Sequence, residues 1–240
     1  MKTTHHTLIL IAGALMTANA AVTVTYDDAD ITEGYMNAHF LTANGGGGKG
    51  GFAFGSGWGI GDLVAVKDAS SNSVTLSPNT IGDANEYWYQ NTSGTAADPV
   101  NPGGPGQLGN KWLEANLYRN VSDGSFAGET LTFKVDVSAF SLTGAHTLQL
   151  FIGDFAPDYS SVNFTETAVT GTGLAEVTAT LINDPARNVQ YGFRFSGENV
   201  WVTDVAPFGS ATIGAVAIPE PSSSLLSLAG VGFLAFRRRK

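Results

Sequence analysis

The chain has 240 residues, a formal net charge of -9, 30 glycines and no cysteine. Without cysteine, disulfides, thiolate zinc sites and cysteine nucleophiles are excluded, so the hydrophobic core alone must hold the fold. The net negative charge repels phosphate backbones, so the composition argues against binding of nucleic acid.

The amino terminus predicts export. Lys2 precedes the apolar run LILIAGALM, and Ala18-Asn19-Ala20 fits the small-x-small rule for cleavage. We therefore assign residues 1–20 to a signal peptide for the Sec export machinery, and we expect the mature chain to begin at Ala21.

Residues 21–218 form the body, which is long enough for one domain with a sizeable core. Glu220 is the one acidic residue outside the body, which therefore holds 20 of the 21 acidic residues. Lys2 and the last four residues are the basic residues outside it, so the body holds 7 of the 12 basic residues. This excess of acids favours solubility outside the cell and the binding of cations.

Alternation of apolar and polar residues with a period of two dominates the body. The stretches ETLTFKVDVSAF, HTLQLFIGDF and NVQYGFRF each place one set of apolar residues on a single face, which is typical of half-buried antiparallel strands. In NVQYGFRF the opposite face carries Gln190, Gly192 and Arg194, and in HTLQLFIGDF it carries Gln149 and Phe151. Further strands are predicted at Val22–Tyr26, Leu63–Lys67, Ser73–Leu76, Glu86–Gln90, Trp112–Tyr118, Ala175–Leu181 and Val200–Val205.

No segment of the body shows a sustained helical period. About ten short strands separated by glycine and proline predict an all-β fold, an antiparallel two-sheet jelly-roll sandwich. Two glycine-rich stretches, residues 44–61 and 91–110, are predicted to be long loops.

Aromatic residues are the candidate ligand-binding groups of the body. A strand at EYWYQ would place Tyr87 and Tyr89 on one face and Trp88 on the other. Exposed rings stack on the apolar C–H faces of sugars, and Trp58 and Trp112 are further candidates. The alternative is that these rings fill the core, so their exposure decides between the two interpretations.

Catalytic carboxylates are the second kind of candidate. A glycosidase needs two carboxylates at a defined separation across a cleft. Asp154 and Asp158 flank Pro157 and are predicted to lie in a turn, and the other candidates are Glu86 and Glu114. Nucleophile elbows and HExxH segments are absent, so we expect no enzymatic activity.

The carboxyl-terminal segment predicts a temporary membrane anchor. Residues 222–236 are uncharged and mostly apolar, and as a helix they would reach about 22 Å, short of a hydrocarbon core about 30 Å thick. Positive charge resists translocation, so the terminal cations would stay on the cytoplasmic side. These cations are Arg237, Arg238, Arg239 and Lys240.

The motif formed by Pro219, Glu220 and Pro221, followed by the apolar segment and the basic end, resembles the PEP-CTERM sorting signal of Gram-negative, often biofilm-forming, bacteria. The resemblance covers residues 219–240. It implies that an exosortase, a membrane-embedded cysteine transpeptidase, recognises the motif and removes the tail, and that the body reaches the cell surface or extracellular matrix. The alternative is a tail anchor that is never cleaved.

The body is similar, in the order of three segments, to bacterial galactose-binding-like jelly-roll carbohydrate-binding modules. These segments are NGGGGKGGFAFGSGW, FAGETLTFKVDV and VWVTDVAPF, in which Gly128, Thr130, Trp201, Asp204 and Val205 match in outline. The resemblance implies a structural calcium ion, with Asp204 on the closing strand and Glu33 or Asp30 as early partners. Thr203 replaces the first of the two usual aspartates, which removes one carboxylate from that site.

Three functional hypotheses follow. The first is an exported surface or matrix protein that adheres to extracellular polysaccharide through its jelly-roll domain and requires no cofactor. The second is a purely structural matrix protein without sugar binding, and the third is a glycan hydrolase or lyase. We expect the first.

Overall fold

The computed structural model describes residues 21–42, 48–90 and 102–217, which form two six-stranded sheets. We name them sheet A and sheet B. Sheet A contains β1 (Ala21–Thr25), β4 (Ala65–Asp68), β5 (Ser73–Leu76), β7 (Thr130–Phe140), β10 (Gly173–Thr180) and β12 (Ala211–Gly214). Sheet B contains β2 (Glu33–Leu41), β3 (Lys49–Gly57), β6 (Lys111–Val121), β8 (His146–Phe155), β9 (Val162–Val169) and β11 (Asn188–Glu198). Two short 3-10 turns, η1 (Gly61–Leu63) and η2 (Ala206–Phe208), complete the described elements.

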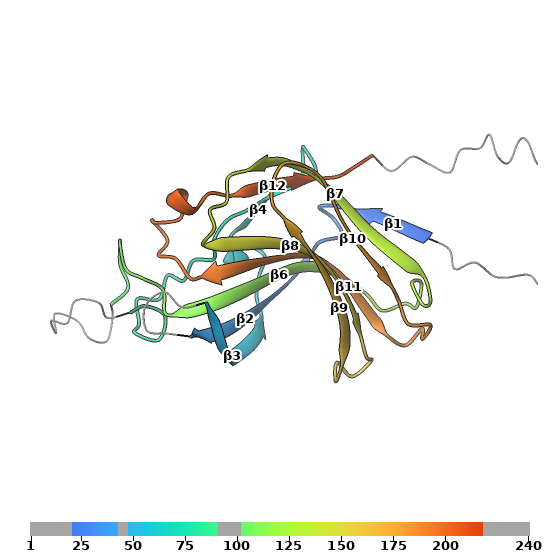
Figure 1. Cartoon of the computed structure of the whole chain (residues 1–240), viewed down its shortest axis with the longest axis horizontal. Helices are drawn as coiled ribbons and strands as arrows, with labels where there is room; N and C mark the ends of the chain where they lie inside the picture. Colours follow the sequence, from blue (N-terminus) through green and yellow to red (C-terminus); the bar gives the residue numbers. More distant parts are fainter. Residues whose placement is uncertain (1–20, 43–47, 91–101, 218–240) are drawn as a thin grey trace, which may run out of the picture.

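The chain passes repeatedly between the two sheets, as in a jelly roll. The strand order of sheet B is β3-β2-β6-β11-β8-β9, and all its pairs are antiparallel. In sheet A, β1 and β12 follow one another along the same edge of β7. Figure 1 shows β12, β7 and β4 in one layer and β6, β2 and β3 in the other. The predicted two-sheet sandwich is confirmed, except that β1 pairs with β7 in parallel.

The core lies between the sheets, and the alternation of the sequence fills it as predicted. Leu131, Phe133, Val135 and Val137 on β7 are buried. On β11 the buried hydrophobic residues are Val189, Tyr191, Phe193 and Phe195. The rings of Phe133 and Phe193 meet across the two sheets with centroids 5.5 Å apart. Because one face of each strand is committed to this core, the other face of sheet B is free to carry a site.

Two predicted strands are wrong. Residues 86–88 form a turn, in which the backbone N–H groups of Trp88 and Tyr89 both donate to the carbonyl of Asn85. The segment Val200–Val205 also turns, because the N–H of Asp204 donates to the carbonyl of Trp201. In both segments short-range hydrogen bonds replace the expected ladder.

Strands β2, β9 and β12 were not predicted, and β3 lies inside a predicted loop, residues 44–61. Glycine is needed in β3 because its neighbours approach closely. A Cβ atom at Gly50 would lie 2.7 Å from the carbonyl oxygen of Phe40, and one at Gly55 would lie 2.7 Å from the hydroxyl of Tyr35. The glycines therefore permit close strand packing here and do not break the strand.

The predicted signal peptide, sorting motif and apolar tail lie outside the described residues. Within the described residues, no helix has the length and hydropathy needed to cross a membrane.

Candidate functional site

The predicted pair of tyrosines does not form a platform. Tyr89 is buried, and its hydroxyl donates to the carbonyl of Ile81 at 2.5 Å and lies 3.1 Å from that of Val200. Tyr87 is exposed, and its ring meets that of Trp88 edge-on with centroids 5.0 Å apart. The two tyrosines do not share a face because the segment is a turn.

The three predicted tryptophans also lie in different surroundings. Trp58 and Trp88 are partly buried and pack against the core, and Trp88 meets Phe54 edge-on at 5.9 Å. Trp112, on β6, lines a cavity of about 620 Å³ together with Asp204. The structure therefore distributes the five predicted rings and does not gather them into one surface.

The candidate calcium ligands do not converge. Asp30 forms an ion pair with Arg119, and Asp204 accepts a hydrogen bond from the N–H of Gly106 at 2.6 Å. Glu33 lies at the start of β2 and lines a different cavity from Asp204. Among the residues described, no three histidine, aspartate or glutamate side chains form a group able to hold a metal ion.

The candidate catalytic acids are similarly dispersed. Asp154 was predicted to lie in a turn, but it lies on β8. It is buried there and forms an ion pair with Arg187 at 2.5 Å. Asp158 does lie in the following turn, where its carboxylate accepts hydrogen bonds from the N–H and hydroxyl of Ser160. Glu86 is exposed in the turn before Tyr87.

Glu114, the fourth candidate acid, is buried on β6 and lies 2.7 Å from the ammonium of Lys49. Burial alone would raise the pKa of Glu114, but the hydrogen bond from Lys49 and the nearby charge of Arg194 outweigh it and lower that pKa. A low pKa suits a fixed ion-pair partner better than a general acid.

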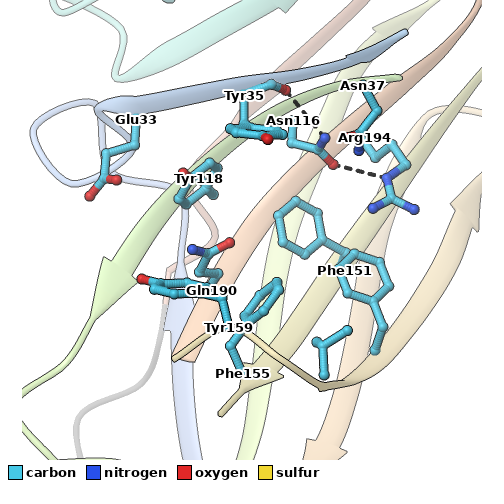
Figure 2. A pocket seen from close by; sticks show the side chains of 12 residues that line it. Glu33, Tyr35, Asn37, Asn116, Tyr118, Phe151, Phe155, Tyr159, Gln190 and Arg194 are labelled. Atoms are coloured by element: carbon cyan, nitrogen blue, oxygen red, sulfur yellow. Dashed lines mark hydrogen bonds between the residues drawn. The ribbon is translucent and has the colours of Figure 1, made fainter. Parts of the chain in front are cut away.

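A groove of about 740 Å³ opens on the outer face of sheet B, opposite the core. Alternate residues of adjacent strands line it, because side chains of one parity share a face. Figure 2 shows this arrangement from close by. The lining residues are Glu33, Tyr35 and Asn37 of β2, Asn116 and Tyr118 of β6, Gln190 and Arg194 of β11, Phe151 and Phe155 of β8, Val162 and Phe164 of β9, and Tyr159 of the β8–β9 turn.

Aromatic rings form one part of the groove. Phe151 and Phe164 stack on adjacent strands, with centroids 5.0 Å apart and an angle of 17° between the rings. Tyr118 meets Phe151 at 6.4 Å, and Phe155 meets Tyr159 at 5.6 Å. Gly153, between Phe155 and Phe164, leaves room for these rings, since a Cβ atom there would lie 2.6 Å from the Phe155 ring.

Tyr159 is exposed and has a positive φ of 59°, a backbone conformation that disfavours a bulky side chain. Such strained residues cluster at binding and catalytic sites. The ring of Tyr159 is thus held at the edge of the groove at a cost to the local backbone.

Polar side chains in the groove are fixed before any ligand arrives. Nε of Arg194 donates to the side-chain oxygen of Asn116 at 2.9 Å, and the Asn116 amide donates to the backbone carbonyl of Tyr35 (Figure 2). Arg194 also pairs with Glu166 of β9 at 2.6 Å, and its guanidinium carbon lies 4.4 Å from the centre of the Phe164 ring. This network ties four of the strands of sheet B together and orients the guanidinium.

Tyr118 supplies a hydroxyl that stays protonated. Burial and the nearby charge of Glu33 raise its pKa to about 12. The hydroxyl therefore remains both a donor and an acceptor of hydrogen bonds at any physiological pH.

Sequence reasoning missed the groove, although part of the signal was present. The residues that alternate with the core-facing ones, and so lie on the opposite face of the sheet, already include Phe151, Gln190 and Arg194. A large ring and a cation on the outward face of predicted strands are the feature that could have indicated it. Five of the other lining residues come from β2 and β9, which were not predicted.

A comparison with protein families matches residues 217–240 to the PEP-CTERM protein-sorting motif. The chain ends in a PEP-CTERM sorting motif. The match confirms the predicted signal, and the motif implies an exported protein that is sorted by an exosortase.

A search of curated proteins finds no match to this chain. A search of solved structures finds a chain described as "Structural basis for the promiscuous specificity of the carbohydrate-binding modules from the beta-sandwich super family". That likeness covers 80% of this chain and 88% of the other, with 16% sequence identity and a TM-score of 0.30. A TM-score this low supports no inference about the ligand of this chain.

Proposed function

We propose that the body binds a glycan in the groove on the outer face of sheet B. The observation that supports this most strongly is the combination of exposed rings with polar groups held in place beside them. Tyr35 and Tyr159 are exposed at the groove, and Arg194 and Asn116 are linked by hydrogen bonds within it.

The chemistry of the groove suits a sugar chain. Aromatic faces attract the slightly positive C–H faces of pyranose rings, and amide, hydroxyl and guanidinium groups pair with sugar hydroxyls. Groups already held by other side chains lose little further freedom on binding, which favours affinity. Glu33 is the single carboxylate among the lining residues, so the groove supports binding better than two-carboxylate hydrolysis.

The sorting motif gives this binding a location. We propose export through the Sec machinery on a signal peptide of residues 1–20, removal of residues 219–240 by an exosortase, and delivery of the body to the surface or matrix of a Gram-negative cell. Adhesion to extracellular polysaccharide would then be the function of the delivered body. Mass spectrometry of the protein from its host tests this route, and recovery of a membrane-bound chain intact through Lys240 would contradict it.

A glycan array with the full chain tests the groove itself. Replacing Tyr35 with alanine removes an exposed ring, and Tyr159→Gly removes a ring while relieving the backbone conformation at that position. Each lost ring is expected to weaken binding by about 0.5–1.5 kcal/mol, roughly a factor of two to ten in Kd.

The matched control is Phe52→Ala, which removes an exposed ring of β3 that does not line the groove. Binding should be unchanged in this variant. The proposal fails if no glycan is retained, or if all three variants bind alike. The first of these results would favour a purely structural matrix protein.

A further inference from the structure

Among the described residues, Lys111, the first residue of β6, has no carboxylate partner, whereas each of the other six body cations has one. The body contains seven lysines and arginines, and six of them pair with an aspartate or glutamate. Lys111 is only 2% exposed, and within the described residues no carboxylate lies within ion-pair distance of its ammonium. A buried cation without a counter-charge is uncommon and is often functional.

Two carbonyls and two aromatic rings surround this ammonium. It donates to the carbonyl of Tyr87 at 2.5 Å and to that of Asn110 at 3.2 Å. It lies 4.0 Å from the centre of the Tyr87 ring and 5.1 Å from that of Phe40. An ammonium has three N–H groups, so the described residues leave one of them without a polar acceptor.

Burial also lowers the pKa of Lys111. A bound carboxylate would supply the missing charge and would favour the protonated ammonium.

The same groups line a cavity of about 730 Å³ that is separate from the groove. Phe40 is 49% exposed and Tyr87 is 40% exposed, which is unusual for rings of this size. Two amide side chains in the wall are oriented by backbone carbonyls, since Gln90 donates to Gly109 and Asn110 donates to Glu86. The cavity thus combines apolar faces, fixed amides and one cation.

We propose that this cavity binds a hexuronate unit of an acidic polysaccharide, with the sugar carboxylate on Lys111 and the pyranose ring against Tyr87 or Phe40. The single cation matches the single charge of a carboxylate. The exposed rings match the C–H face of a pyranose, and the amides match its hydroxyls. Glu86 also lines the cavity, and its negative charge would oppose that of the ligand.

Calorimetry with the full chain tests the site with matched ligands. The probes are oligosaccharides of galacturonate, glucuronate and mannuronate, each compared with its carboxyl-reduced form. A charge-assisted hydrogen bond in a buried site should make at least one acidic probe bind about tenfold or more tightly than its reduced form.

Variants then assign this preference to the cavity. Lys111→Met keeps the apolar stem of the lysine and should abolish the preference for the acidic form. Tyr87→Ala should weaken binding of the acidic probe, and Glu86→Gln should strengthen it severalfold because it removes a repulsive charge. Tyr87 and Glu86 are both exposed, so their variants remain informative if Lys111→Met fails to fold.

Tyr159→Gly separates this site from the groove, since it should leave the preference for the acidic probe intact. The proposal is overturned if no acidic probe binds, if acidic and reduced probes bind equally, or if a folded Lys111→Met protein keeps the preference. Loss of the preference in Tyr159→Gly would place the acidic ligand in the groove and would also overturn it.

Discussion

The ion pair between Asp154 and Arg187 gives a sharp prediction about stability. Asp154 is 2% exposed on β8, and its carboxylate lies 2.5 Å from Nε of Arg187. It also accepts a hydrogen bond from the N–H of Ile182 at 2.9 Å, and Arg187 donates to the backbone carbonyl of Asp154 at 2.7 Å. This pair fastens the connection between β10 and β11 to the carboxyl-terminal end of β8.

Asp154→Asn should destabilise the fold strongly. Asparagine keeps the shape and can still accept from Ile182, but it carries no charge and leaves Arg187, whose side chain is only 11% exposed, without its counter-charge. Removing one partner of a buried ion pair costs about 3–5 kcal/mol. For a domain of this size that corresponds to a fall in Tm of about 6–20 °C.

Urea unfolding of the full chain, followed by intrinsic fluorescence, measures this loss. The control is Glu176→Gln, which removes the partner of Lys134 at 3.0 Å in an exposed pair of sheet A. Glu176 has a half-exposed side chain, so its loss should cost less than about 1 kcal/mol. If Asp154→Asn and Glu176→Gln shift the unfolding midpoint equally, burial does not govern the strength of these pairs and the reasoning is wrong.

Three further predictions concern packing, pH and processing. Gly192→Ala should lower the free energy of unfolding in urea by about 3 kcal/mol, because its Cβ would lie 2.0 Å from the carbonyl oxygen of Leu117. In the control Gly51→Ala, the new Cβ meets no atom within 4 Å, so the free energy of unfolding should change by less than about 0.5 kcal/mol. Burial lowers the pKa of His146 below its ordinary value of 6.5, so the unfolded chain takes up a proton more readily. Stability should therefore be fully present above pH 6.5 and decline below it, and His146→Gln should flatten this decline in unfolding midpoints measured from pH 7.5 to 5.5. Replacing residues 219–221 with alanine should leave the tail attached, as mass spectrometry of the protein from its host would show; normal removal of the tail would count against the motif.

The sequence was informative where burial imposes a regular pattern. Strand β7 was predicted from the alternation of Leu131, Phe133 and Val135, because each of these residues faces the same core. The sequence of β3 instead predicts a loop, because its glycines serve the close approach of β2 and no local pattern indicates a neighbouring strand. Similarly, Glu86–Gln90 alternates like a strand, but Asn85 accepts two backbone hydrogen bonds and turns the chain.

The groove was harder to predict than the fold, for a physical reason. Its wall comes from β2, β6, β8, β9 and β11, which are adjacent only after the sheet has formed. No spacing along the chain links Tyr35 to Arg194, although Asn116 connects them directly. The sorting motif is the opposite case, because its parts are consecutive and are recognised as a linear segment.

The point at which the chain leaves the body determines which of the two sheets lies next to the carboxyl-terminal segment. The N–H of Val216 donates to the hydroxyl of Thr25 on β1, so the chain leaves the sandwich from sheet A (Figure 1). Only Ala217 and Ile218 lie between Val216 and Pro219, so Pro219 is at most about 11 Å from this bond along a fully extended chain. A protein that binds the chain at Pro219 would therefore lie close to sheet A. The groove lies on the outer face of sheet B, which points away from sheet A.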